Sequence, residues 1–457
     1  MSKIFVGFSR VNINPMRGIG VAGYYKVRHA EGILDDLEAV ALALSDGEKK
    51  AVVISMDLCQ VQTPVCDRLR RAVAEATGLD ASAVYLHSTH THTAPYVDVE
   101  RAKAGGLDTE EDLRLVAEYQ DFLCHRIVDV TKAALEDLAP ARIGTGVSVA
   151  RNVAFIRRFR MKDGSVRTNP GVDNPDIVAP IGEIDDRVSV VRFDREGAPT
   201  IVLASFANHP DVVGGNLLSG DWPAMTRRTV EKALDNTRCI FLNGAQGDIN
   251  HVNVHPTGGF GNDLFMDFDD VARGYGHARY MARVVSGAVM QIFDKVEYRE
   301  ADTLRFAQKL IELPSNRPAP EEMAEAHRIN DIHTAGHDEL LPYEGMMLTT
   351  VVADAARKVR LENGPDAFTL RLSAVAFGDV ALIGIPGEPF NGVGRALKLA
   401  EGYGMVIPSC LVNGSEGYFP MRDAYEEGGY EARSSNYKVG GAERLIDEGL
   451  SLLAELK

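Results

Sequence analysis

Two histidines separated by one residue follow an apolar segment and are the clearest chemical feature of the chain. Val84–Leu86 is typical of a buried strand, and His90 and His92 come shortly after it. Because side chains two apart on a strand point to the same side, both imidazoles would face one pocket. Neutral imidazoles suit a zinc ion. An isolated pair of this kind is equally compatible with two surface histidines.

Two later strand ends carry further potential ligands. His209 follows the apolar segment Ile201–Phe206, and Pro210 ends that strand because proline has no N–H to donate. Glu388 follows the apolar segment Val380–Ile385 and a Pro-Gly pair. We expect Glu388 to begin a helix, whose N-terminus stabilises a carboxylate. It would then be either a hard oxygen ligand for zinc or only a helix cap.

Polar residues in two other segments are candidates for a supporting or substrate-binding role. Asp221 and Trp222 precede a predicted helix, and Asp221 would cap that helix or orient a histidine from behind. Asp248 and Asn250 lie in a glycine-rich polar segment after a predicted strand. Glycines there would let the backbone approach a ligand closely.

Two tyrosines and two more histidines carry less weight alone. Tyr418 and Tyr430 lie in glycine-rich segments predicted to be loops, where a tyrosine is usually a packing residue. His251 and His255 are four apart, a spacing that matters only in a helix. The nearby glycines and Pro256 argue against a helix, so we do not expect a second metal there.

The elements that position these residues follow from apolar periodicity. Strand-like segments alternate with helical patterns, and the pairs 188–193 with 201–206 and 369–376 with 380–385 are joined by short turns typical of hairpins. Hairpins among helical connections predict an α/β fold with mixed β-sheets flanked by outer helices. We expect residues 1–457 to form one large domain.

Composition excludes several partner classes. The net charge is −16, from 49 Lys and Arg against 65 Asp and Glu, so phosphate backbones and anionic membrane surfaces are repelled. We expect a small-molecule substrate, with no nucleic acid and no membrane as partner. An odd number of cysteines without a CxxC pair, no signal-like N-terminus and no apolar run of about 20 residues predict a cytoplasmic protein. Segments 162–183 and 253–269, rich in Gly, Pro, Asn or Asp, predict long loops.

Taken in order, these segments resemble the catalytic domain of the neutral ceramidases, zinc-dependent N-acylsphingosine amidohydrolases. The resemblance lies in the stretch from His90 to Pro95, the strand-ending His209, the Pro-Gly-Glu turn at Glu388, and tyrosines at Tyr418 and Tyr430. It implies that one zinc ion is held by four side chains, namely His90, His209, Glu388 and Tyr418. It also places three residues around the substrate carbonyl, namely His92, Arg157 and Tyr430.

The chain departs from that family at one catalytic position. The family carries a serine in its GDVSPN loop, and Asn250 stands in its place here. An amide cannot act as a hydroxyl nucleophile, so an acyl-serine route is excluded at this position, although Asn250 could hydrogen-bond an oxyanion. Members that act on ceramide also carry an extra C-terminal domain and are exported. Neither feature is seen in this sequence, so we do not expect ceramide as the substrate.

The sequence therefore predicts a zinc-dependent hydrolase of an amide, ester or lactone bond in a small polar substrate. Attack would come from zinc-bound hydroxide. Asn250 would assist catalysis, and three further residues would bind substrate, namely Asp221, Asp248 and Trp222. The alternatives are a lipid N-acyl amide hydrolase such as a ceramidase, a catalytically inactive zinc-containing binding protein, and a binuclear amidohydrolase barrel, which needs eight βα repeats.

Overall fold

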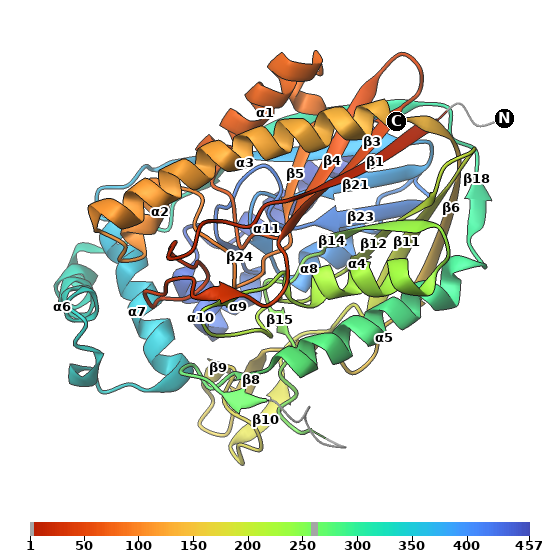
Figure 1. The fold of residues 1–457 in the computed structure, drawn as a ribbon. Coiled ribbons are helices and arrows are strands. Elements are labelled where there is room, and N and C mark those ends of the chain that lie inside the picture. The colour runs from red at the N-terminus through yellow and green to blue at the C-terminus, as the bar shows by residue number, and fades with distance from the viewer. Residues whose placement is uncertain (1–3, 257–263) are drawn as a thin grey trace.

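The computed structural model describes residues 4–256 and 264–457, and it contains two main β-sheets (Figure 1). The larger sheet has the order β14 (Thr237–Asn243), β12 (Thr200–Phe206), β11 (Arg187–Arg195), β6 (Ala139–Val149), β1 (Phe5–Asn12), β3 (Glu38–Ser45), β4 (Lys50–Met56) and β5 (Val84–Ser88), with β18 (Glu297–Arg299) beside β6. The smaller sheet has the order β19 (Leu304–Pro314), β20 (Ala367–Phe377), β21 (Val380–Gly384) and β23 (Met405–Ser409).

One apolar core lies between the two sheets and takes side chains from both. Val53 and Leu203 of the larger sheet are buried together with Val375 and Leu382 of the smaller sheet. Strand β3 is apolar throughout because both of its faces are buried. Its residues at 40, 42 and 44 face this core, while those at 39, 41 and 43 face the helices on the other side.

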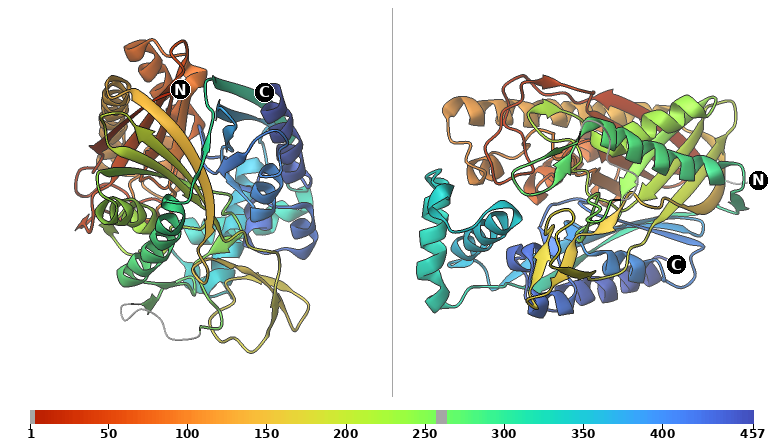
Figure 2. Two further views of the ribbon diagram at one scale, coloured as in Figure 1. Left: turned by 90° about the vertical axis from the view of Figure 1, so that its right-hand side faces the viewer. Right: turned by 90° about the horizontal axis from the view of Figure 1, so that it is seen from below.

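Helices cover the outer faces of both sheets, so the layers run helix, sheet, sheet, helix (Figure 2). The outer face of the larger sheet is covered by α1 (Thr63–Thr77), α3 (Glu110–Glu136), α4 (Asp221–Ala233) and α5 (Tyr275–Phe293). The smaller sheet is covered by α8 (Asn391–Leu397) and α11 (Gly441–Glu455). Helices α6 (Met323–Thr334) and α7 (Gly345–Leu361) pack together at one end of the molecule. None of the described helices is both long and apolar enough to cross a membrane.

The predicted mixed α/β architecture is confirmed, including both hairpins. β11 and β12 pair antiparallel, as do β20 and β21, whereas β4–β5, β12–β14 and β21–β23 are parallel pairs. A run of antiparallel neighbours in the larger sheet excludes the eight-stranded parallel barrel.

The larger sheet curls until its first and last strands approach each other. Ser55 on β4 donates to the carbonyl of Phe241 on β14 at 2.7 Å. The backbone N–H of Asn243, at the end of β14, donates to Nε2 of His87 on β5 at 3.0 Å. The chain segments that follow β5, β12 and β14 are therefore held side by side, which decides where the functional site forms.

The prediction of a loop over 162–183 is wrong in part. The segment contains β9 (Val166–Thr168) and β10 (Ile177–Pro180), which pair on either side of β8 (Arg158–Met161). An Asp-Gly turn makes the hairpin, because Gly164 adopts a φ of +83° that suits such turns. In the second predicted loop, residues 257–263 lie outside the described part of the chain. Its remainder contributes β16 (Phe265–Met266), which pairs with β17 (Ala272–Arg273).

A fully buried ion pair holds α4 against the larger sheet. Both Arg227 on α4 and Asp57, directly after β4, have 0% side-chain exposure, and the guanidinium donates to both carboxylate oxygens at 2.8 and 2.7 Å. The same guanidinium lies 3.2 Å from the carboxylate of Glu38. The pair therefore connects α4 to the adjoining ends of β3 and β4.

Replacing Arg227 with Met should lower the free energy of unfolding by about 3–5 kcal/mol, because Asp57 would be left as an uncompensated buried charge. Urea denaturation followed by circular dichroism measures this. Adding Asp57→Asn to the same protein should recover part of the loss. A single variant as stable as the wild type would show that the pair contributes nothing to holding α4.

Candidate metal centre

Four side chains that the family resemblance assigned to zinc meet at one point. Nε2 of His90 and Nε2 of His209 each lie 3.2 Å from Oε2 of Glu388. The hydroxyl of Tyr418 lies 3.4 Å from Nε2 of His209. All four residues are buried, with relative exposures between 1% and 8%. Two imidazoles and a carboxylate aimed at one point form a common zinc donor set.

Backbone carbonyls fix the orientation of both imidazoles. Nδ1 of His90 donates to the carbonyl of Cys59 at 2.8 Å, and Nδ1 of His209 faces the carbonyls of Gln246 and Ile249 at 2.9 and 3.0 Å. With Nδ1 protonated for these bonds, each Nε2 keeps its lone pair for a metal. This is the usual arrangement behind a ligating histidine.

The histidines do not reach the site by strand alternation, so that part of the prediction is wrong. Strand β5 ends at Ser88, and His90 has a left-handed φ of +79°. The chain therefore turns at His90. His92 still faces the same centre, because its Nε2 lies 3.2 Å from Nε2 of His90.

Glu388 and the tyrosines also sit on elements other than those predicted. Glu388 does not begin a helix: it lies in β22 (Glu388–Pro389), which pairs in parallel with β24 (Tyr418–Phe419) and sets Glu388 directly opposite Tyr418. Backbone bonds from Glu388 to Gly417 and from Phe390 to Phe419 keep the chain extended there. Tyr430 begins the short helix α10 (Tyr430–Ser434), and its ring meets that of Tyr418 at 5.5 Å.

Burial and mutual attraction set the charges of these groups. Burial disfavours the ionised form of Glu388, but the neighbouring His90 and His209 outweigh it and hold the pKa of Glu388 well below its usual value. Burial, with Arg157 nearby, lowers the pKa of His209 to about 4. Burial also opposes a charge on His90, but Glu388 overcomes it and holds the pKa of His90 well above its usual value. A cation and a proton would thus compete for His90 beside an ionised carboxylate.

Asn243 links the two histidine-bearing segments and was not recognised as a site residue from the sequence. Its amide Nδ2 donates to the carbonyls of Thr89 and Asn208, each at 3.0 Å, and its Oδ1 accepts from the N–H of Asn208 at 3.2 Å. Thr89 and Asn208 directly precede His90 and His209. One fully buried amide thereby fixes the spacing of two ligands. In the sequence, the sign of this role is that Asn243 is a polar residue at the end of an apolar strand.

Arg157 lies within the site and is held by Glu431, another residue that the sequence reasoning missed. Its Nε donates to Oε1 of Glu431 at 2.6 Å. One terminal nitrogen donates to the hydroxyl of Tyr418 at 3.2 Å, and the other lies 3.5 Å from Nε2 of His209. The pairing of β7 (Phe155–Ile156) with β15 (Ile249–Asn250) brings this arginine beside the centre.

His92 has a different environment from His90. Its Nδ1 lies 3.7 Å from the carboxylate of Asp211, which receives two bonds from Arg273 at 2.9 Å each and one from the hydroxyl of Tyr24 at 2.6 Å. Burial would raise the pKa of Asp211, but Arg273 holds it well below its usual value. Gly23 packs over the imidazole, where a Cβ would lie 2.8 Å from the ring.

Asp221 and Trp222 do not face the centre of the site but hold the backbone near His209. The Asp221 carboxylate accepts backbone N–H groups from Val212 and Val213 at 2.9 Å each, and burial raises its pKa to about 7. The Trp222 ring is fully buried against two phenylalanine rings, and its Nε1 donates to the carbonyl of His209 at 3.2 Å. Both residues fix the chain around His209.

Asp248 and Asn250 are likewise engaged with protein groups. Asp248 accepts from the N–H of Asn391 at 2.7 Å, and burial raises its pKa to about 6. The amide of Asn250 donates to Asn169 at 2.8 Å, and the residue is 1% exposed. Gly247 lets this segment pack against the Glu388 turn, since a Cβ there would lie 2.6 Å from the Glu388 carbonyl oxygen.

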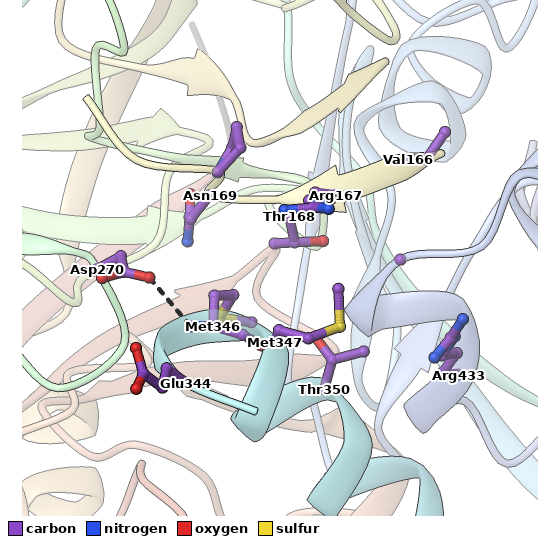
Figure 3. A pocket seen from close by; sticks show the side chains of 12 residues that line it. Val166, Arg167, Thr168, Asn169, Asp270, Glu344, Met346, Met347, Thr350 and Arg433 are labelled. Atoms are coloured by element: carbon purple, nitrogen blue, oxygen red, sulfur yellow. Dashed lines mark hydrogen bonds between the residues drawn. The ribbon is translucent and has the colours of Figure 1, made fainter. Parts of the chain in front are cut away.

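A cavity of about 120 Å³ adjoins the Arg157–Glu431 pair. Figure 3 shows Thr168 and Asn169 on one side of it, and Met346 and Met347 of α7 on the other. Thr168 belongs to both cavity and site, because its hydroxyl donates to Oε2 of Glu431 at 2.9 Å. A second cavity of about 570 Å³ includes Asp248 in its wall.

No protein-family model matches this chain, and no curated protein matches it. Solved structures do match. The neutral ceramidase of Pseudomonas aeruginosa gives a TM-score of 0.72 at 17% sequence identity, over 100% of this chain and 75% of that chain. A ceramidase complexed with C2 gives 0.69 at 18% identity, over 100% and 76%. This chain has the neutral ceramidase fold. The predicted resemblance is confirmed at the level of the fold.

Within the described residues, one other group has metal-ligand spacing, and it shares His90 with the first. It consists of Cys59, His90 and His92. The Cys59 sulfur lies 3.9 Å from Nδ1 of His90, the nitrogen already bonded to a carbonyl, so the group with Glu388 is favoured. His251, considered for a second metal, donates through Nε2 to the carbonyl of Ala272 at 2.7 Å.

His209→Ala should reduce bound zinc to near zero, because the other donors cannot replace a ligand fixed by two carbonyls. Elemental analysis of purified, dialysed protein measures this. His125→Ala, on the exposed face of α3, is the matched control and should bind as much zinc as the wild type. Full zinc content in His209→Ala, with intact circular dichroism, would remove His209 from the ligand set.

Proposed function

We propose that this protein is a zinc-dependent hydrolase that cleaves an amide, ester or lactone bond in a small polar substrate. The convergence of His90, His209 and Glu388, each at hydrogen-bond range of its neighbour, carries the proposal. Tyr418 is the fourth proposed ligand. The likeness of the fold to ceramidases, which hydrolyse an amide, supports it.

A zinc ion held there would supply a Lewis acid and lower the pKa of water from 15.7 to about 7. The chain provides the remaining groups. Arg157 and Tyr430 would donate to the oxyanion that forms as the carbonyl is attacked, and losing one such donor typically costs about 3 kcal/mol. His92 would give a proton to the leaving nitrogen or oxygen. Asp211 would orient His92 for that transfer.

Asn250 supports direct hydrolysis without a covalent intermediate. It replaces the serine of the neutral ceramidases, and its amide is bonded to Asn169 and to the N–H of Val252 at 2.8 and 3.0 Å. No hydroxyl is therefore offered at this position. We assign Asn250 the role of holding the segment that carries Asn169, and we propose that water is the nucleophile.

Hydrolysis of a lipid amide is the second candidate, because the two solved structures compared above are ceramidases. A small polar substrate is favoured by the polar and charged groups around the centre and by its narrow access, with His92 and Tyr418 each 8% exposed. A zinc-containing binding protein is the third candidate function.

The cytoplasmic location expected from the sequence stays a prediction.

A panel of p-nitrophenyl esters, lactones, N-acyl amino acids and short-chain ceramide should separate these candidates. We expect hydrolysis of at least one small polar compound, loss of activity with chelator, and recovery with added zinc. Turnover of ceramide alone would favour the lipid hydrolase. Unchanged turnover after complete metal removal would overturn zinc dependence. Tight binding without turnover across the panel would favour the binding protein.

Tyr430→Phe should lower kcat by about 100-fold or more with little change in KM or zinc content, because it removes one donor to the oxyanion. Steady-state kinetics on the best panel substrate measures this. Tyr425→Phe is a suitable control, since the Tyr425 hydroxyl donates to the Tyr437 carbonyl at 2.9 Å and serves packing. Equal kcat in Tyr430→Phe and wild type would remove the hydroxyl from the mechanism.

A further inference from the structure

One hydroxyl group lies between the two side chains that we propose stabilise the oxyanion. Oγ1 of Thr168 accepts the backbone N–H of Tyr430 at 3.2 Å and donates to Oε2 of Glu431 at 2.9 Å. The other carboxylate oxygen of Glu431 accepts from Nε of Arg157 at 2.6 Å. Thr168 is 4% exposed and Glu431 is fully buried, so these bonds are shielded from solvent. Arg157 and Tyr430 are therefore joined through a single threonine.

Strand pairing fixes where this hydroxyl lies. β9 pairs antiparallel with β8, and Thr168 stands directly opposite Arg158. Next along the chain, the N–H of Asn169 donates to the carbonyl of Arg157 at 2.8 Å. Residues directly opposite each other project to the same face of a sheet, and on this face the Arg158 guanidinium pairs with Glu427 at 3.0 Å. The β8–β9 hairpin thus holds the threonine beside the chain that leads into α10.

Helix α10 needs a side chain from elsewhere at its first residue. The first N–H groups of a helix have no partner within it, and Gly429, directly before Tyr430, has no side chain to offer. Thr168 accepts the N–H of Tyr430 instead. Gly429 has a left-handed φ of +98°, and a Cβ there would lie 3.4 Å from Oγ1 of Thr168. The glycine therefore leaves room for the hydroxyl that replaces its missing cap.

The contacts of Arg157 leave one nitrogen for a substrate. Its Nη2 donates to the carbonyl of Gly247 at 2.7 Å and to the hydroxyl of Tyr418 at 3.2 Å, while Nε donates to Glu431. Nη1 donates to no oxygen within the described part of the chain, and it lies 3.5 Å from Nε2 of His209. Nη1 is thus the nitrogen that would reach an oxyanion beside the metal. Because a guanidinium group is planar, the bond from Nε to Glu431 sets the direction of Nη1.

We infer that Thr168 is a positioning residue for the proposed hydrolysis, because its hydroxyl fixes Tyr430 directly and Arg157 through Glu431. This inference rests on the proposed function and adds that both oxyanion donors are held as one hydrogen-bonded unit. Donors that are already aimed at a developing charge need no reorganisation during the reaction. Small displacements of a catalytic group lower rates steeply. Loosening this unit should therefore reduce kcat and leave KM nearly unchanged.

Two substitutions at one position test the inference. Thr168→Val keeps the shape of the side chain without its hydroxyl, whereas Thr168→Ser keeps the hydroxyl. On the best substrate of the panel, Thr168→Val should lower kcat about tenfold with unchanged KM and zinc content, and Thr168→Ser should stay within about twofold of the wild type. Thr350→Val is the matched control, since Thr350 borders the same cavity and its hydroxyl donates to the carbonyl of Met346 within α7 at 2.8 Å.

Two further measurements separate positioning from a general structural effect. In a protein that already carries Arg157→Lys and Tyr430→Phe, adding Thr168→Val should lower kcat by no more than about twofold, because residues that act as a unit are not additive. A phosphonate analogue of the same substrate mimics the tetrahedral oxyanion and gives a readout without turnover. Calorimetry should show about tenfold weaker binding of this analogue to Thr168→Val, with binding of the product acid unchanged.

Equal kcat in Thr168→Val and the wild type would overturn the inference and leave the hydrolase intact. The inference would also fail if Thr350→Val lost as much activity, or if the tenfold loss persisted without both donors. Loss of zinc from Thr168→Val would overturn it too, because the hydroxyl would then support the metal site instead of the donors. If the wild type cleaves no compound of the panel, the proposed function fails and this inference fails with it.

Discussion

The site depends on a carboxylate that is almost fully enclosed. Removing the charge of Glu388 from water costs several kcal/mol, and only close partners offset such a cost. His90 and His209 supply them at 3.2 Å each, and Arg157 adds a positive charge that is balanced by Glu431. An apolar contact in its place would stabilise the fold without this cost of removing a charge from water. A cation at the proposed metal site would offset this cost further, and much of the surrounding backbone holds the carboxylate in place.

The arrangement works because side chains link the segments that bear the ligands. The curl of the larger sheet brings β5 and β14 together, and Asn243 then bonds the residues preceding both histidines. Glu388 comes from the smaller sheet, and its place is set by a two-residue parallel pairing with Tyr418. Rigid strands thus set the coarse position of each segment. Hydrogen bonds to single residues set the final distances, which must hold to a fraction of an ångström for catalysis.

Residue types and strand ends were enough to predict the mixed α/β fold, and the resemblance to the neutral ceramidases then selected the side chains that meet in space. The elements carrying them were harder to predict. Glu388 is followed by Pro389 and a helix, which locally resembles a helix start, but pairing with a strand thirty positions later keeps it extended. Asp211, Asn243 and Glu431 were missed for the same reason. Each acts through a long-range contact, and nothing in the local sequence distinguishes a linking amide or acid from a solvated one.

His90 and His92 show how neighbouring residues of one type acquire different chemistry. Nδ1 of His90 is bonded to a backbone carbonyl, which fixes its Nε2 lone pair toward the centre and suits a permanent ligand. Nδ1 of His92 instead faces Asp211, a carboxylate kept ionised by Arg273. Burial holds the pKa of His92 well below its usual value, and the negative charge of Asp211 opposes that shift, which favours the proton-donating form. The partner of each Nδ1, rather than the spacing of the pair, therefore distinguishes the proposed ligand from the proposed acid.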